Sequence, residues 1–269
     1  PSDPYFYDVT LLLSGDGTNG GQNNTFLDSS TNNFTITRNG NTTQGSFSPY
    51  GNLWSNYFDG SSYLTWTGSS IGTSAFTFEC WFFYTGTAFP PSGQDAAAFI
   101  GPASGSNSAL NLNINNSTTM SFDRFAVSAN YFTVPTLSAN TWYHVAFVRD
   151  ASNNTTVFLN GTRSSTGVVS SSINYTGTTN AVGFTGGGVS RYFPGYLSQS
   201  RLVIGSAVYD PTQTTITVPT TPLTAITNTS LLTCQSNRFI DNSANNFALT
   251  VSGTPSVQRF SPFNPTSAY

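Results

Sequence analysis

The run FTFECWFFY at residues 76–84 limits what this chain can fold into more than any other segment. Side chains of a β-strand point alternately to two faces, and both faces of this run are largely apolar over its second half. We therefore predict a central strand that is covered on both sides. A helix would need apolar residues at a period of about 3.6, and no segment of the chain sustains that period.

Shorter alternating runs recur between clusters of Gly, Asn, Asp, Ser and Pro. WYHVAFVR at 142–149 and TTVFLN at 155–160 flank the polar residues DASNN, which is the pattern of a β-hairpin with its turn. RLVI at 201–204 predicts a further strand. Many short strands separated by turn residues indicate an all-β chain, folded as an antiparallel two-sheet sandwich or jelly roll.

The composition sets limits on partners and location. Charged residues make up only 7% of the chain and aromatic residues 14%, so aromatic side chains fill the core and neutral polar groups hydrate the exterior. This balance is typical of a durable virion-surface or extracellular protein. The net charge of −3 and the absence of a basic run predict no nucleic-acid partner. No apolar stretch approaches the roughly 18 residues of a membrane span, so we predict no membrane insertion.

Two stretches of the chain are near copies of each other. FLDSSTNNFTITRNGNTTQGSFSPY at 26–50 and FIDNSANNFALTVSGTPSVQRFSPF at 239–263 are identical at 11 of 25 positions without a gap. Chance would supply roughly two matches, so the similarity is a repeat. Either the second copy opens another unit of a longer tandem array, or it packs on its own domain or on the sheet edge of a neighbouring subunit.

The hairpin and several other segments share the signature of one family. The hairpin combines a Trp-x-His-Val-Ala strand, a polar turn and a second strand that ends in Asn-Gly. The matching segments elsewhere are FDGSSYLTW at 58–66, FTFECWFFY at 76–84, FPGYLSQSRLVIGSAVYDP at 193–211, and the opening pair DPYFYDVTLLLSGDGTNG and FLDSSTNNFTI. Together they resemble laminin-G-like, concanavalin A-like jelly-roll domains, and the opening resembles the start of such domains in bacteriophage structural proteins.

The resemblance implies a fold and a division of the chain. It covers roughly residues 4–215 and implies two curved antiparallel sheets of six or seven strands, packed face to face. We predict a laminin-G-like jelly-roll domain at 1–217 and a Pro/Thr linker at 218–227. A C-terminal β-hairpin segment at 228–269, which resembles residues 10–50, completes the chain.

The resemblance leaves the function open, because this superfamily includes lectins, glycanases and adhesive spacers. We expect a non-enzymatic structural or adhesive protein of a virion surface, such as a phage tail fibre or a capsid decoration protein. Its partners would be other subunits of the same homo-oligomer or virion lattice, and a host-surface glycan. The alternatives are a secreted carbohydrate-binding module or glycanase, and a bacterial surface or matrix fibre subunit.

The scarcity of acids and bases argues against catalysis. A glycanase of this superfamily needs a pair of carboxylates, but Glu79 is the sole glutamate and has no partner near in sequence. We predict that Glu79 is a structural carboxylate paired with an Arg. His144, the lone histidine, lies inside the hairpin strand, where the family has a structural histidine. Cys80 and Cys234 form either one disulfide or two buried thiols.

The resemblance implies no required cofactor, although family members often hold calcium through Asp and backbone oxygens. Asp28, Ser30 and Asn32 place oxygen atoms at alternate positions, and Asp16 lies in a related GDGTNG loop. The second copy repeats the pattern with Asp241, Ser243 and Asn245. The alternative is an Asx-turn, in which the Asp side chain caps the loop into the next strand. The sequence leaves both interpretations open.

Two segments carry candidate glycan-binding residues. Arg191, Tyr192 and Phe193 follow a glycine run, and Asn130 and Tyr131 form the second candidate. Aromatic rings can stack on sugar faces while Asn and Arg hydrogen-bond to hydroxyl groups. The alternative is that both groups of aromatic residues pack over an end of the sandwich.

Overall fold

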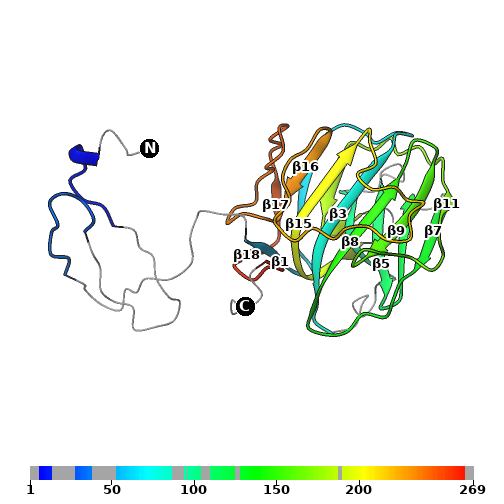
Figure 1. Cartoon of the computed structure of the whole chain (residues 1–269), viewed down its shortest axis with the longest axis horizontal. Coiled ribbons are helices and arrows are strands. Elements are labelled where there is room, and N and C mark those ends of the chain that lie inside the picture. The colour runs from blue at the N-terminus through cyan, green and yellow to red at the C-terminus, as the bar shows by residue number, and fades with distance from the viewer. Residues whose placement is uncertain are drawn as a thin grey trace. The chain divides into compact units, whose positions relative to one another are not determined.

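The computed structural model forms two compact units. They are Pro1–Gly51, here the small unit, and Asn52–Tyr269, the large unit (Figure 1). The structure describes residues 6–13, 28–37, 53–86, 94, 96–103, 110–124, 128–186 and 190–263.

Residues 6–13 and 28–37, the described part of the small unit, contain little regular structure. It contains η1 (Phe6–Asp8), a 3-10 turn, and an antiparallel bridge between Leu13 and Asp28. Across the described ranges η1 is the one helical element, and no helix there is long and apolar enough to cross a membrane. Asn33 lies at φ 49°, in the left-handed region that Asn tolerates better than most residues.

The first sheet of the large unit has nine strands. Their order is β10-β9-β8-β3-β15-β1-β18, with β11 beside β9 and β16 beside β15. The strands are β1 (Ser55–Asp59), β3 (Phe76–Tyr84), β8 (Thr141–Arg149), β9 (Asn154–Leu159), β10 (Thr162–Arg163), β11 (Val169–Ser170), β15 (Pro194–Ile204), β16 (Thr229–Thr233) and β18 (Ser256–Gln258). Every pairing within it is antiparallel.

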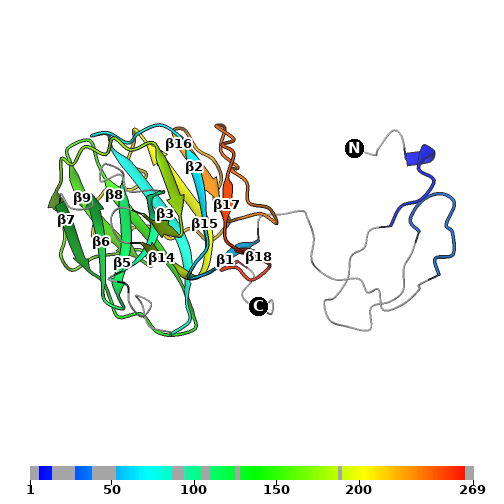
Figure 2. The same cartoon turned by 180° about the vertical axis from the view of Figure 1, so that it is seen from behind.

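The second sheet has seven strands in the order β17-β2-β12-β4-β5-β6-β7, all antiparallel (Figure 2). Its strands are β2 (Tyr63–Thr67), β4 (Ala97–Pro102), β5 (Asn111–Asn116), β6 (Thr119–Arg124), β7 (Ser128–Thr133), β12 (Thr179–Val182) and β17 (Thr250–Ser252). A separate two-stranded ribbon pairs β13 (Phe184–Thr185) with β14 (Arg191–Tyr192). The predicted all-β, two-sheet antiparallel jelly roll is confirmed, although one sheet has more strands than the resemblance implied.

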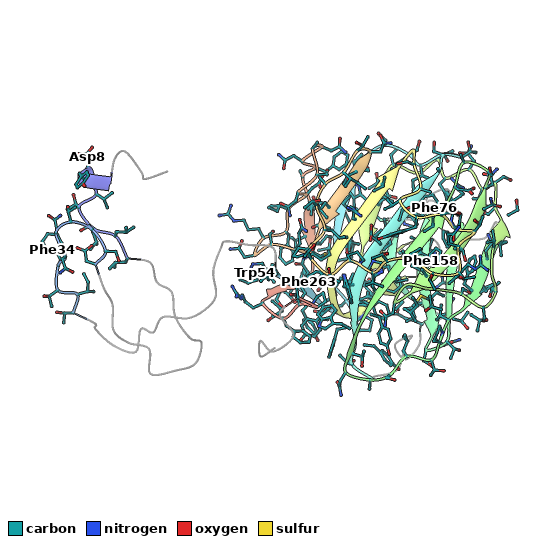
Figure 3. The ribbon with its side chains drawn as sticks, viewed as in Figure 1. Asp8, Phe34, Trp54, Phe76, Phe158 and Phe263 are labelled. Atoms are coloured by element: carbon teal, nitrogen blue, oxygen red, sulfur yellow. The ribbon has the colours of Figure 1, made fainter. Side chains whose placement is uncertain are left out.

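The core lies between the two sheets and is built around β3. Phe78, Cys80 and Phe82 are fully buried in it, and Glu79 and Phe83 on the other face of β3 are buried as well. The prediction of a central strand covered on both sides is confirmed. Figure 3 shows the side chains that fill the sandwich. Rings packed 5–6 Å apart, such as Phe82 on Phe99 at 5.2 Å, gain more than their buried area alone supplies.

The predicted hairpin consists of β8 and β9. Val145 of β8 pairs with Leu159 of β9, and the turn between the strands begins at Asp150. The Oδ1 atom of Asp150 accepts the N–H groups of Ser152 and Asn154, each at 2.8 Å. This Asx-type turn explains why the polar run closes the hairpin.

The second copy of the repeat is part of the sandwich. We call residues 229–263 the C-terminal copy and residues 9–50 the N-terminal copy. In the C-terminal copy β16 pairs with β15, β17 with β2 and β18 with β1. The predicted division set the segment 228–269 apart from the jelly roll, whereas the structure builds its strands into both sheets. The physical reason is that unpaired strand edges favour added strands.

The two cysteines are free, buried thiols, so the structure selects that alternative over a disulfide. Burial raises the pKa of Cys80 well above its ordinary value and that of Cys234 to about 12. Both thiols therefore stay protonated and pack as small apolar side chains.

Candidate functional site

The predicted calcium residues of the N-terminal copy form a closed hydrogen-bond network. The carboxylate of Asp28 accepts the N–H of Leu12 at 3.0 Å and those of Ser30 and Phe34 at 2.9 Å each. It also accepts the Ser30 hydroxyl at 2.9 Å. These bonds, led by that from Leu12, lower the pKa of Asp28 to about 2. Asn32 donates its amide to the carbonyl of Thr10 at 2.9 Å.

The C-terminal copy repeats this network. Asp241 accepts from Leu232 N at 2.9 Å, Ser243 N at 2.8 Å and Phe247 N at 2.9 Å. Because the carboxylate oxygens are already used by the chain itself, this donor set does not fit a calcium ion, which needs six to eight free oxygens. The Asx-turn alternative fits both copies. Among the described residues no group of three or more His, Cys, Asp or Glu could hold a metal, and Asp16 lies outside them.

Glu79 holds the centre of a buried ionic cluster. Its Oε1 accepts Nε and Nη2 of Arg201 at 3.1 and 2.5 Å. Its Oε2 accepts the Tyr209 hydroxyl at 2.8 Å and lies 3.1 Å from Nε2 of His144. Burial alone would raise the pKa of Glu79, but the hydrogen bond from His144 and the charge of Arg201 outweigh it and leave the pKa below its ordinary value. The carboxylate thus joins strands, as predicted, and faces no second carboxylate in these contacts.

The first predicted glycan segment lies on β14 and just after it. Tyr192 is half-buried, with its ring 4.8 Å from Phe184, and Tyr63 stacks on Phe184 at 4.2 Å. Arg191 is half-buried beside them. Phe193 is fully buried, 5.4 Å from Phe99, so it cannot stack on a sugar. The sequence signal for Phe193 was misleading because the residue follows a glycine run but points into the core.

The second predicted segment lies on β7, the edge strand of the seven-stranded sheet. Tyr131 is 56% exposed, whereas its neighbour Phe132 is buried in the core. Asn130 is half-buried. The structure does not bring the two predicted segments together, because β5 and β6 lie between β7 and β4, the strand that β14 contacts.

Next to Tyr131 lies a row of buried polar side chains that the sequence reasoning missed. Asn113 of β5 pairs with Ser121 of β6, and Ser121 pairs with Tyr131 of β7. Directly opposed residues in an antiparallel sheet share a face, so these side chains lie in one line. Asn111, two residues before Asn113, extends the row along β5. We call Asn111, Asn113, Ser121 and Tyr131 the amide face.

The amides of this row are buried without partners. Asn111 and Asn113 are fully buried, and among the described residues neither the oxygen nor the nitrogen of either amide has a hydrogen-bond partner. The Ser121 hydroxyl is unpaired in the same way. Each buried polar group left unpaired costs about 1–3 kcal/mol, so a row of them is unusual in a stable sandwich. Because Asn111, Asn113 and Ser121 are fully buried, an external ligand cannot reach them in this structure; Tyr131 is the exposed member of the row.

Alternation along β5 builds this arrangement. In the run NLNIN, Leu112 and Ile114 point into the core while the asparagines take the other face. That period-two pattern of Asn is the sequence signal from which this row of side chains could have been predicted. On β6 and β7, Met120 and Phe132 occupy the core side in the same manner.

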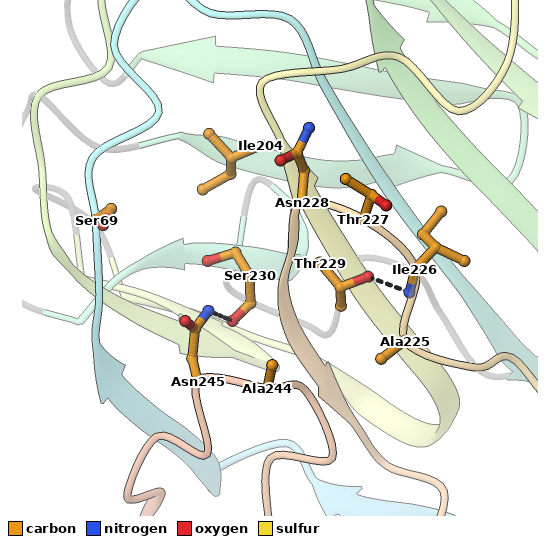
Figure 4. Close-up of a pocket in the computed structure, with 10 residues that line it drawn as sticks. All are labelled: Ser69, Ile204, Ala225, Ile226, Thr227, Asn228, Thr229, Ser230, Ala244 and Asn245. Carbon is orange, nitrogen blue, oxygen red and sulfur yellow. Dashed lines mark hydrogen bonds between the residues drawn. The ribbon is translucent and has the colours of Figure 1, made fainter.

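A pocket of about 460 Å³ lies where the C-terminal copy meets the linker before it (Figure 4). It is lined by Ser69, Ile204, Ala225, Ile226, Thr227, Asn228, Thr229, Ser230, Ala244 and Asn245. Its polar groups are partly used by the chain: Asn245 donates to the Ser230 carbonyl at 3.0 Å, and the Ile226 N–H donates to the Thr229 hydroxyl at 2.8 Å. Because its lining has no aromatic or charged side chain, this pocket is a weaker candidate for a glycan site than the exposed ring of Tyr131.

Comparisons with known proteins agree with the fold. The family described as the concanavalin A-like lectin/glucanases superfamily matches residues 58–204. A comparison with curated protein sequences found no match. Among solved structures, a Bacteroides ovatus ATCC 8483 protein, provisionally assigned as carbohydrate-binding, is 15% identical with a TM-score of 0.53, over 86% of this chain and 66% of that one.

Two further solved structures are similar at lower TM-scores. Domains LG4-5 of the mouse laminin α1 chain are 14% identical with a TM-score of 0.42, over 62% of this chain and 47% of that one. The CBM40 of Ruminococcus gnavus IT-sialidase, bound to α2,3 sialyllactose, is 14% identical with a TM-score of 0.41, over 59% of this chain and 95% of that one. The chain spans less than two thirds of the Bacteroides ovatus and laminin structures.

Proposed function

The chain belongs to the concanavalin A-like lectin/glucanase superfamily, and on that premise we propose that it is a non-enzymatic adhesion protein that binds a neutral glycan at the edge strand β7, on the exposed ring of Tyr131. The observation that carries this proposal is the ring of Tyr131, which is 56% exposed, next in sequence to the half-buried amide of Asn130. Amides supply both donors and acceptors, and a sugar hydroxyl needs both. An exposed tyrosine ring supplies an apolar face for a pyranose ring.

The chemistry of this edge favours a neutral sugar over an acidic one. Neither Asn130 nor Tyr131 adds a cationic group, and the chain as a whole has a net charge of −3. Recognition of an anionic group would call for arginine or a helix N-terminus near the ligand. Arg191 and Tyr192, which lie on β14, form the second glycan site that we propose.

A non-catalytic role is the second part of the proposal. Glycoside hydrolysis needs two carboxyl groups that flank the scissile bond. Glu79, the sole glutamate, is buried and bound to Arg201, Tyr209 and His144. Its carboxylate links β3 to β15 through Arg201, and we propose no catalytic role for it.

We further propose that the chain is a virion-surface protein, such as a tail fibre or capsid decoration protein. Its low charge and the resemblance of its opening segment to phage structural proteins support this context. Immuno-electron microscopy with antibodies against the chain tests it: labelling of phage particles is the expected result. Labelling of bacterial cell surfaces or of a secreted fraction alone would contradict it.

The glycan site is tested by Tyr131→Ala on a glycan array. Tyr131→Ala should weaken binding at least tenfold, because it removes the exposed ring on which the sugar stacks. Tyr7→Ala, which removes an exposed ring of the small unit, is the matched control and should leave binding unchanged. Binding that survives Tyr131→Ala would overturn the assignment.

A further inference from the structure

We propose that the N-terminal copy is a docking segment that completes a second jelly roll, by adding Val9–Leu13 to the strand equivalent to β15. The partner is another domain of this fold whose sheet edge is not covered by its own C-terminal copy. The inference does not depend on glycan binding. It rests on how the two copies of the repeat compare.

The two copies form the same local structure. Ser29 N donates to the Leu12 carbonyl at 2.9 Å, and Asn242 N donates to the Leu232 carbonyl at 2.6 Å. Asn33 and Asn246, at equivalent positions, have φ of 49° and 46°. The Asp-centred networks described above also match bond for bond. Residues 9–13 and 28–37 of the N-terminal copy therefore already have the local structure of their docked equivalents.

The two copies differ in what covers them. Leu231 and Leu232 are 0% and 2% exposed beside β15, whereas the equivalent Leu11 and Leu12 are 50% and 39% exposed. Burying such a leucine contributes about 1.5–3 kcal/mol of favourable free energy, which an exposed leucine does not gain. Neighbouring leucines exposed on a preformed segment mark an interaction surface.

The anchors of the C-terminal copy recur in the N-terminal copy. Phe247 packs so closely over Gly68 that a Cβ there would lie 3.0 Å from its ring, and the equivalent Phe34 is 52% exposed. Phe260 lies 4.8 Å from Phe83, and its equivalent in the sequence is Phe47. A surface that accepts the C-terminal copy thus fits the N-terminal copy at Phe34, and the sequence supplies a phenylalanine for the second anchor.

This surface identifies the class of partner. In the large unit the C-terminal copy covers it, with Arg201 opposite Leu232 and Leu202 opposite Leu231. A jelly roll of the same fold with an open edge would offer the same backbone groups and apolar contacts. Strand addition of this kind takes its affinity from main-chain hydrogen bonds and its specificity from pockets for alternate side chains.

The test uses two full-length chains. The acceptor chain carries Val203→Cys with Leu231→Asp and Leu232→Asp, which release its C-terminal copy, and the donor chain carries Val9→Cys. Both chains also carry Cys234→Ser, because release of the C-terminal copy would otherwise expose this native thiol. Val203 lies opposite Thr229, the equivalent of Val9, so docking in register places the introduced thiols together. We expect a disulfide-linked heterodimer on a non-reducing gel. A chain with Val203→Cys and Thr229→Cys, which should close internally, checks the geometry of the pair.

Two controls make the result decisive. Adding Leu11→Asp and Leu12→Asp to the donor should abolish the heterodimer, and moving the acceptor thiol to the exposed turn with Ser152→Cys should do the same. A heterodimer that persists in either control, or that never forms, overturns the proposal. If the released acceptor fails to fold, Val203→Cys alone is used, and local opening of the C-terminal copy should trap the donor slowly. If this single variant does not trap the donor chain either, the proposal is also overturned.

Discussion

In the C-terminal copy Leu231 and Leu232 are buried beside β15, whereas Leu11 and Leu12 of the N-terminal copy are exposed, although both copies fold the same Asp-centred turn. The difference shows that the Asp-centred turn forms from local sequence, whereas burial of the leucines depends on contacts with another part of a sheet. The turn is held by hydrogen bonds that Asp28 accepts from residues up to six positions later, and by one that it accepts from Leu12 in the preceding segment. Burial of the leucines needs a sheet edge, and in the C-terminal copy β15 provides it.

The largest effect that tests this difference between the two copies is expected from Glu79→Gln. Arg201, the ionic partner of Glu79, also donates to the Thr224 carbonyl at 2.8 Å and lies opposite Leu232, so the cluster supports the edge that holds the C-terminal copy. Leaving the Arg201 charge without its carboxylate should cost the large unit about 3–5 kcal/mol. Urea unfolding followed by tryptophan fluorescence measures this loss.

The same variant should leave the small unit unchanged. Hydrogen exchange at Ser30 and Phe34, whose amides bond Asp28, provides the control. The lowered pKa of Glu79 also sets a direction with pH: its contribution is present above the unfolded value of about 4.3 and is lost as pH falls through the folded pKa. A variant as stable as the parent at neutral pH would show that the cluster does not hold the edge.

A smaller effect is expected from truncating one leucine in each copy. Leu231→Ala removes a fully buried side chain and should cost about 2–5 kcal/mol. Leu11→Ala, at the equivalent exposed position, should stay within about 0.5 kcal/mol. Chemical denaturation of the two variants compares them directly. Equal losses would mean that the N-terminal copy is already docked in solution, and the comparison would then fail.

These contrasts explain which parts of the fold the sequence could predict. The central strand at 76–84 and the hairpin at 142–160 follow from period-two alternation and turn residues, which are local signals. The place of the C-terminal copy in both sheets depends on which edges are open, and no local pattern reports that. The repeat predicted that the second copy opens another unit, packs on its own domain or packs on a neighbouring subunit, and the sequence did not decide between these alternatives.

The candidate site shows the same division. Tyr131 was predicted because its neighbours and its ring suit a sugar, and the structure leaves it exposed. Phe193 was predicted by the same reasoning but is buried, since exposure depends on which face of the strand it takes. Asn113 was missed because the sequence does not show that its amide is buried without a hydrogen-bond partner. That property depends on how β5, β6 and β7 pair, which local sequence patterns do not report.

The smallest expected effect concerns the turn that both copies share. The pKa of Asp28 is about 2, below its ordinary value of 3.8, because the N–H groups that it accepts favour the charged form. Its contribution to the order of the small unit is therefore present above about pH 4 and is lost as pH falls towards 2. Carbon-detected NMR of the Asp28 carboxyl should give a midpoint near 2, while exchange at Leu12 quickens over the same range. Asp28→Asn, which cannot ionise, should make that exchange independent of pH between 2 and 4 apart from intrinsic chemistry. A midpoint near 3.8 would mean that the turn is not formed without a sheet to dock on, and the local half of the comparison would be lost.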